Sequence, residues 1–198
     1  MILYGSPGGC SQAAHIALNE ANIAHQYVKV GRDKRTEDGR DFNKINAKGY
    51  TPALEMEDGT LLTESLAILV YISEKAGGLL AESGIARWKT LEATEFMTTE
   101  LHANFRPLFY PDATDAEREK ATNNLIKRFD TLAEQLSDNA FLIGDNMTIA
   151  DTYLFVMLSW ADLMNIPVSH KFEAYKSRLI NRPSVIATLN VEGLLPMK

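Results

Sequence analysis

The residue best suited to chemistry in this sequence is Cys10, the only cysteine among 198 residues. It follows a short apolar run and the turn Gly5–Gly9, and a helical pattern begins at Cys10 or Ser11. The unpaired N–H groups and the positive dipole end of a helix N-terminus stabilise a thiolate. We therefore predict a reactive thiol with a lowered pKa, and a small buried apolar residue is the structural alternative.

Cys10 has no partner in the chain, which excludes an intramolecular disulfide and a cysteine-based zinc site. A resolving thiol must then come from another molecule, and in the cytosol glutathione would serve. Neither GxxxxGK[ST] nor GxGxxG occurs, and no histidine pair has H-x3–5-H spacing. We expect no metal site and no nucleotide site of these kinds.

Two segments of the first half could hold a peptide-like ligand. Glu64 and Ser65 open an apolar helix, where a hydroxyl and free N–H groups suit a carboxylate and an acidic side chain suits an ammonium. Thr51-Pro52 precedes a strand, and a cis bond there would turn the backbone of Thr51 toward an extended ligand. Plain helix capping by Ser65 and an ordinary trans turn are the structural alternatives.

Two basic features are less specific. Residues 29–48, which include Lys34, hold seven basic side chains against four acidic ones and could attract a small anion. His102 lies on the first helical segment of the second half and could act as a donor or a base. A solvated charged face and a packed histidine are the corresponding structural alternatives.

The elements that position these residues in the first half alternate between strand and helix. The apolar runs expected to form strands are 2–4, 27–30, 53–56 and 61–62. The helical patterns are 10–21, 39–45 and 65–75. In the order βαβ–α–ββα, the first two strands are parallel and their crossover is right-handed.

The second half contains helical patterns only. A long helix is expected over 85–109. Thr114 and Thr148 each precede an acidic residue three positions later, which is the pattern of a capping box. We therefore predict an α/β domain over 1–77 followed by an all-helical domain over 83–198.

Composition and charge exclude several classes of protein. The 45% apolar and 23% charged residues are typical of a globular chain, neither disordered nor collagen-like. Twenty basic residues against 26 acidic ones give a net charge of −6, which disfavours a nucleic-acid-binding protein. No apolar run is long enough for a membrane span and no secretory pattern is present, so we expect a cytoplasmic protein without membrane contact.

Five segments, taken in order, resemble the glutathione S-transferases of the bacterial, cysteine-type beta class. They are 4–11, 49–54, 61–68, 99–102 and 147–151. Each is weak alone, but their order and spacing agree with that family over essentially the whole chain. The resemblance implies a thioredoxin-like first domain, a helical bundle domain and a homodimer. In such a dimer the active sites lie between the first domain of one subunit and the helical domains.

The resemblance also implies roles for the candidate residues. Cys10 would face the sulfur of glutathione and form a mixed disulfide with it, and His102 would approach that sulfur from the helical domain. Thr51 and Pro52 would pair with the cysteinyl backbone of glutathione. The other residues implied to bind glutathione are Lys34 near the glycyl carboxylate, Glu64 and Ser65 at the γ-glutamyl end, and Thr99 and Glu100 beside His102.

Two positions depart from the family pattern. Relatives often carry tyrosine where this chain has Gly5, whereas here the tyrosine is Tyr4, and strand parity sends its ring to the opposite face of the sheet. We therefore assign Tyr4 no catalytic role. Glu95 stands where relatives commonly carry asparagine near glutathione, and an acidic side chain there would weaken an anion contact.

The predicted function is conjugation of glutathione, as co-substrate, to small electrophiles, together with thiol–disulfide exchange through Cys10 and without a metal. One alternative is a non-catalytic binding or regulatory protein with the same fold. Another is a glutathione-dependent isomerase or dehalogenase. The presence of Cys10, Glu64 and Ser65 favours an enzyme.

Overall fold

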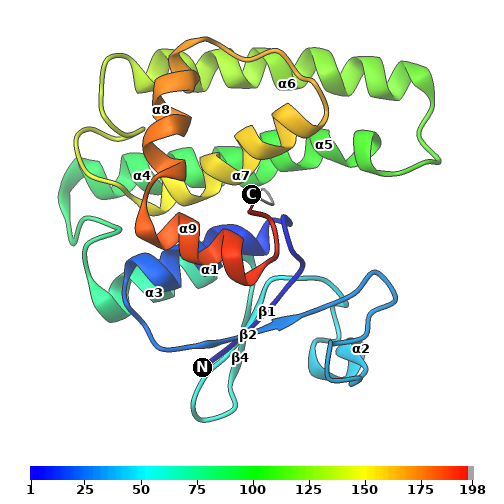
Figure 1. Ribbon diagram of the computed structural model, residues 1–198. Coiled ribbons are helices and arrows are strands. Elements are labelled where there is room, and N and C mark those ends of the chain that lie inside the picture. The colour runs from blue at the N-terminus through cyan, green and yellow to red at the C-terminus, as the bar shows by residue number, and fades with distance from the viewer. Residues whose placement is uncertain (196–198) are drawn as a thin grey trace. The chain divides into compact units, whose positions relative to one another are not determined.

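The computed structural model describes residues 1–195 and divides the chain into two compact units (Figure 1). The first unit contains residues 1–82 and 181–195, and the second contains residues 83–180. A mixed sheet with helices followed by a helical segment confirms the predicted fold class. The sequence pattern placed the last helix in the helical domain, whereas its contacts group it with the first unit.

The first unit is built on a four-stranded sheet with the order β2-β1-β3-β4. β1 (Ile2–Gly5) pairs in parallel with β2 (Gln26–Lys29), as the βαβ pattern predicts. On its other side β1 pairs antiparallel with β3 (Ala53–Glu55), which forms the predicted hairpin with β4 (Leu61–Thr63). The strand ends therefore bring the turn after β1 and the entrance to β3 to the same part of the sheet.

Helices of the first unit pack on each other as well as on the sheet. They are α1 (Ser11–Glu20), α2 (Phe42–Ile45), α3 (Ser65–Ala76) and α9 (Pro183–Val191). α1 contacts both α3 and α9, and the three helices lie together in Figure 1. The apolar positions of α1 are almost fully buried, which explains how α1 can pack on both neighbours.

Tyr4 belongs to the core of the first unit. Its ring is fully buried in a cluster that includes Val28 and Phe42. Its hydroxyl donates to Glu55 Oε2 at 2.8 Å and accepts from Arg40 Nη1 at 3.1 Å. These contacts give Tyr4 a structural role, in line with the strand-parity argument.

The second unit consists of helices. They are α4 (Gly84–Phe96), the π-helical turn η1 (Met97–Leu101), α5 (His102–Phe109), α6 (Asp115–Leu136), α7 (Ile149–Leu163) and α8 (Lys171–Ile180). α7 is buried along most of its length and is apolar on nearly all sides. Within residues 1–195, no helix is long and apolar enough to cross a membrane.

Both predicted capping boxes are present in the second unit. At the start of α6, Thr114 Oγ1 accepts from the Glu117 N–H at 3.3 Å, and the Glu117 carboxylate accepts from the Thr114 N–H at 2.8 Å. At the start of α7, the Thr148 N–H donates to Asp151 Oδ2 at 2.7 Å. The Tyr175 hydroxyl also donates to Asp151, so this carboxylate joins two helices as well as capping one.

The long helix predicted over 85–109 is interrupted by η1. Threonine hydroxyls before and within the turn donate to carbonyls of the preceding turn, as Thr94 does to Thr90 at 2.7 Å and Thr99 does to Glu95 at 2.9 Å. Such bonds compete with the helical ladder and bend helices. A π-helical turn adds one residue, so the side chains that follow it leave the helix on another face.

Candidate functional site

Cys10 lies at the N-cap of α1, immediately after the glycine-rich turn that follows β1. The turn requires glycine at Gly8, where φ is +68°, in the left-handed region. The sulfur of Cys10 lies 3.5 Å from the carbonyl oxygen of Thr51, to which the thiol donates. The structure therefore confirms the predicted position of Cys10 at a helix start, and it places the segment that precedes β3 beside the sulfur.

Burial raises the pKa of the Cys10 thiol to about 11. The Ser65 hydroxyl and the N–H groups at the start of α1 favour the thiolate, while the charge of Glu64 opposes it. The prediction of a lowered pKa was wrong. It considered the effect of the helix N-terminus on the thiolate but not the loss of water around the sulfur, which is the larger effect. The ligand-free protein therefore carries a protonated thiol near neutral pH.

Glu64 and Ser65 lie beside Cys10, but not in the way helix capping predicts. Glu64 is the N-cap residue of α3, with φ of +74°, and neither side chain caps the helix. The Ser65 hydroxyl instead acts on the Cys10 thiol, whose pKa it lowers. Glu64 Oε1 accepts hydrogen bonds from Lys48 Nζ at 2.5 Å and from the Tyr50 hydroxyl at 2.8 Å. The structural alternative for Ser65, capping of the helix by its side chain, is therefore not observed.

Lys48 and Tyr50 are contacts of the site that the sequence analysis did not single out. The Lys48 ammonium also donates to Thr63 Oγ1 at 2.9 Å, so it sits where a carboxylate and a hydroxyl converge. These bonds, with the Lys48 ammonium first, hold the pKa of Glu64 below its usual range. The only sequence signal for Lys48 was its place in the basic stretch 29–48.

Two other candidates of the first unit have different surroundings. The Thr51–Pro52 peptide bond is cis, so the alternative of an ordinary trans turn is excluded. Lys34 is exposed on the loop between β2 and α2, and its φ is +62°. Among residues 1–195, no contact joins the Lys34 side chain to Cys10 or Glu64.

Three candidates of the second unit lie together on and next to η1. The Thr99 hydroxyl donates to the carbonyl of Glu95, and the Glu100 carboxylate forms an ion pair with Arg128 at 2.9 Å. His102 is the first residue of α5. The structure therefore groups the three along one stretch of helix, and each of them has a bond inside its own unit.

His102 is packed against aromatic side chains. Its Nδ1 lies 2.8 Å from the hydroxyl of Tyr153, which is fully buried on α7. The Trp160 ring meets the imidazole edge to face, with 5.1 Å between ring centroids. Burial lowers the pKa of His102, so the imidazole is neutral near pH 7. The sequence analysis missed Tyr153, because nothing local links positions that are 51 apart.

Chemically, the first unit offers a thiol, a carbonyl, a hydroxyl and a carboxylate within one cluster around Cys10. A carboxylate suits an ammonium, and hydroxyl and N–H donors suit a carboxylate or a sulfur anion. This donor set matches a small peptide that carries a thiol. In residues 1–195 no group of three or more histidine, cysteine, aspartate or glutamate side chains could hold a metal ion.

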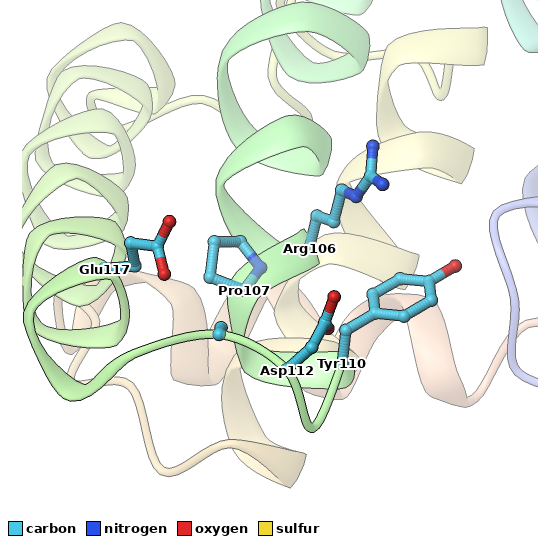
Figure 2. Close-up of a pocket in the computed structure, with 6 residues that line it drawn as sticks. Arg106, Pro107, Tyr110, Asp112 and Glu117 are labelled. Atoms are coloured by element: carbon cyan, nitrogen blue, oxygen red, sulfur yellow. The ribbon is translucent and has the colours of Figure 1, made fainter.

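A separate pocket of about 260 Å³ lies in the second unit at the end of α5. Figure 2 shows Arg106 and Tyr110 on the α5 side of the pocket and Glu117 on the α6 side. Glu117 belongs to the capping box of α6, and Arg106 stacks over the Tyr110 ring at 5.5 Å. None of the predicted site residues lines this pocket.

Comparisons with known proteins all indicate the same family. The glutathione S-transferase N-terminal domain model matches residues 8–75 and the C-terminal domain model matches residues 96–183. Glutathione S-transferase GstA of Escherichia coli O157:H7 is 39% identical, over 98% of this chain and 100% of its own.

Two solved structures are similar over their full lengths. A sphingomonad glutathione S-transferase complexed with glutathione aligns with a TM-score of 0.92 and 36% identity, over 98% of this chain and 100% of that one. The bacterial beta class glutathione S-transferase of Sphingomonas chungbukensis aligns with a TM-score of 0.90 and 35% identity, over the same shares of both chains.

Proposed function

The chain belongs to the glutathione S-transferase family, and we propose that it conjugates glutathione to small electrophiles and exchanges disulfides through Cys10. The single observation that carries the proposal is the cluster of Cys10, Thr51, Glu64 and Ser65 at the N-termini of α1 and α3. A binding protein without catalysis would have no need of a thiol at this position.

The proposed contacts follow the chemistry of each group of glutathione. Glu64 takes the γ-glutamyl ammonium in place of the Lys48 ammonium, and the Ser65 hydroxyl takes the adjacent carboxylate. Thr51 and Pro52 pair with the cysteinyl backbone. The remaining proposed contacts are Lys34 at the glycyl carboxylate, and Thr99, Glu100 and His102 from the second unit.

Conjugation requires a glutathione thiolate beside an electrophile. The glutathione thiol loses its proton, its sulfur forms a bond to the electrophilic carbon, and the leaving group departs with its electron pair. The protonated Cys10 thiol can donate to the sulfur anion, and a fixed donor of this kind stabilises the charge. His102 is the catalytic residue proposed from the second unit.

Disulfide exchange uses Cys10 differently. The Cys10 thiolate attacks the glutathione sulfur of a mixed disulfide between glutathione and a second thiol, and that thiol leaves as its thiolate while Cys10 becomes bonded to glutathione. A glutathione thiolate then attacks the disulfide at Cys10, glutathione disulfide leaves, and the Cys10 thiolate is restored. Because the pKa of Cys10 is raised, this reaction accelerates as pH increases.

The test is to measure both activities on the wild type and on Cys10→Ser. We expect the wild type to bind a glutathione resin and to turn over chlorodinitrobenzene and hydroxyethyl disulfide. In Cys10→Ser we expect the loss of disulfide exchange with part of the conjugation retained, because bound glutathione supplies its own sulfur. Binding to the resin without either turnover would overturn the enzyme proposal in favour of a binding protein.

The proposal also includes assembly and location. A homodimer is supported by Ile85 and Trp88 on α4, whose side chains are 73% and 64% exposed in the isolated chain. The small-molecule partners are glutathione and electrophilic or disulfide substrates. We propose a cytoplasmic location, because glutathione is the thiol buffer of that compartment.

A further inference from the structure

The pair formed by His102 and Tyr153 is a buried contact that the proposed roles do not use. Tyr153 lies on α7 and is fully buried, and its hydroxyl is 2.8 Å from Nδ1 of His102. The imidazole ring also packs against Trp160 at 76°, so its orientation is held from two sides. A side chain fixed in this way presents its other ring nitrogen, Nε2, in a set direction.

The state of the imidazole decides what Nε2 can do. His102 is neutral near pH 7, because burial lowers its pKa. A neutral imidazole has one N–H donor and one acceptor nitrogen, and the bond made by one nitrogen fixes the role of the other. The hydroxyl of Tyr153 can therefore set the chemistry of Nε2 without touching a substrate.

The stronger of the two possible pairings has the phenol as donor. A phenol O–H is a better donor than a neutral imidazole N–H, and an imidazole nitrogen is a better acceptor than a phenol oxygen. When Tyr153 donates to Nδ1, the proton of the ring resides on Nε2. The opposite pairing would leave a lone pair on Nε2, which repels an anion.

We infer that Tyr153 is a positioning residue, which donates to Nδ1 of His102 and thereby keeps the imidazole in the tautomer that carries its proton on Nε2. This inference rests on the proposed function, since it gives His102 the task of donating the Nε2–H to the glutathione sulfur anion. The donor is neutral and needs no carboxylate partner, unlike a histidine that acts as a charged acid.

The test uses Tyr153→Phe, which removes the hydroxyl and keeps the ring. Two-bond ¹H–¹⁵N spectra of histidine-labelled protein without glutathione report the tautomer, with His102→Gln used to assign the signals. We expect a protonated Nε2 and an unprotonated Nδ1 at His102 in the wild type, and a second tautomer in Tyr153→Phe. The kcat for chlorodinitrobenzene should fall about tenfold, with a smaller change in the KM for glutathione.

Two controls separate positioning from structural support. Tyr175→Phe removes another buried phenol hydroxyl of the same unit, which donates to Asp151, and should leave the His102 tautomer unchanged. In a His102→Ala background, Tyr153→Phe should have no further effect on kcat, because the hydroxyl acts through the imidazole. Circular dichroism checks that each variant is folded. If a variant is not folded, the two-bond spectrum of the wild type alone decides the tautomer.

A protonated Nδ1 at His102 in the wild type would overturn the inference. So would an unchanged tautomer in folded Tyr153→Phe, or a further loss of kcat from Tyr153→Phe without His102. A wild type that shows the expected tautomer but conjugates no electrophile would leave the His102–Tyr153 pair in place and overturn the proposed function instead.

Discussion

Cys10 shows how a half-buried side chain can behave opposite to its local sequence context. Its thiol sits at a helix N-terminus and receives hydrogen bonds that favour the thiolate, yet burial raises its pKa to about 11. At pH 7 the thiol is then protonated in the ligand-free protein. Reactivity at this site depends on pH and on what a bound substrate does to the solvation of the sulfur.

Alkylation of the single cysteine tests this directly. The rate of reaction with iodoacetamide should be low near pH 7 in the folded protein and should rise as pH increases toward about 11. The same protein in denaturant is the control, and its midpoint should lie near the ordinary value of about 8.5. Equal rates for folded and denatured protein at pH 7 would contradict a raised pKa.

Ser65→Ala separates binding from folding. The substitution removes a hydroxyl that lowers the pKa of Cys10, so this pKa should rise further. Calorimetry should show glutathione affinity falling at least about tenfold, since hydrogen bonds to charged groups contribute ~1.5–3 kcal/mol. Thermal stability should change little, because the side chain does not cap α3. Ser83→Ala, at another helix start without a side-chain cap, is the matched control for stability.

Tyr27 carries the one buried side-chain oxygen or nitrogen without a hydrogen-bond partner in residues 1–195. A buried hydroxyl without a partner is destabilising by roughly 1–3 kcal/mol, whereas the ring keeps its stacking on His15 at 4.5 Å. We therefore expect Tyr27→Phe to raise the free energy of unfolding by about 1 kcal/mol. Urea denaturation measures it, and a destabilised Tyr27→Phe would show that the hydroxyl has a partner in solution.

At the scale of elements, contacts from the end of α9 hold the turn that precedes Cys10. Glu192 at the end of α9 is buried, and its carboxylate accepts from the Gly8 N–H and from Gln12 Nε2, both at 2.9 Å. It also bonds to Nδ1 of His15 at 2.9 Å. Contacts from the far end of the chain thus fix the turn two residues before the thiol.

Glu192→Ala should therefore be strongly destabilising. It removes the acceptor of two buried side chains, Gln12 and His15, and an acceptor of the half-buried Gly8 N–H, and breaking a largely buried network of this kind lowers the free energy of unfolding by about 3 kcal/mol. Glu119→Ala, at an exposed position of α6, should stay within about 0.5 kcal/mol of the wild type. A loss of less than about 1 kcal/mol in Glu192→Ala would show that the network contributes little.

Local sequence patterns predicted the elements that depend on near neighbours. The parallel β1–β2 pair, the β3–β4 hairpin and both capping boxes were predicted correctly, because turn residues and cap residues act within a few positions. The family inferred from five short segments is confirmed by the domain models. The roles of the individual site residues stay predictions.

What the sequence could not predict depends on distant contacts. Desolvation of Cys10 requires the packed surroundings of α1, and the grouping of α9 with the first unit requires Glu192 to meet His15 across 177 positions. The π-helical turn before His102 interrupts a segment whose apolar spacing predicts one continuous helix. In each case a tertiary contact or a backbone irregularity changed a correct local pattern.

For the whole molecule, the exposed face of α4 is the feature that an isolated chain does not explain. Ile85 and Trp88 lie one turn apart and are 73% and 64% exposed, although large apolar side chains gain ~1.5–3 kcal/mol each on burial. In a two-fold symmetric interface each residue is buried twice, so its contribution to association is doubled. The proposed homodimer therefore has its strongest physical support at these two positions.

Trp88→Arg tests the dimer. Light scattering of the wild type at micromolar concentration should give about twice the chain mass of 22.0 kDa, and Trp88→Arg should shift the average toward the single-chain value. Losing two buried indoles removes roughly 3–6 kcal/mol, which raises the dissociation constant by at least about a hundredfold. Lys89→Ala, on the same helix but ion-paired with Glu92, should stay dimeric. A wild type at the mass of one chain would contradict the dimer, and a Trp88→Arg protein that remains fully dimeric would place the interface away from this face.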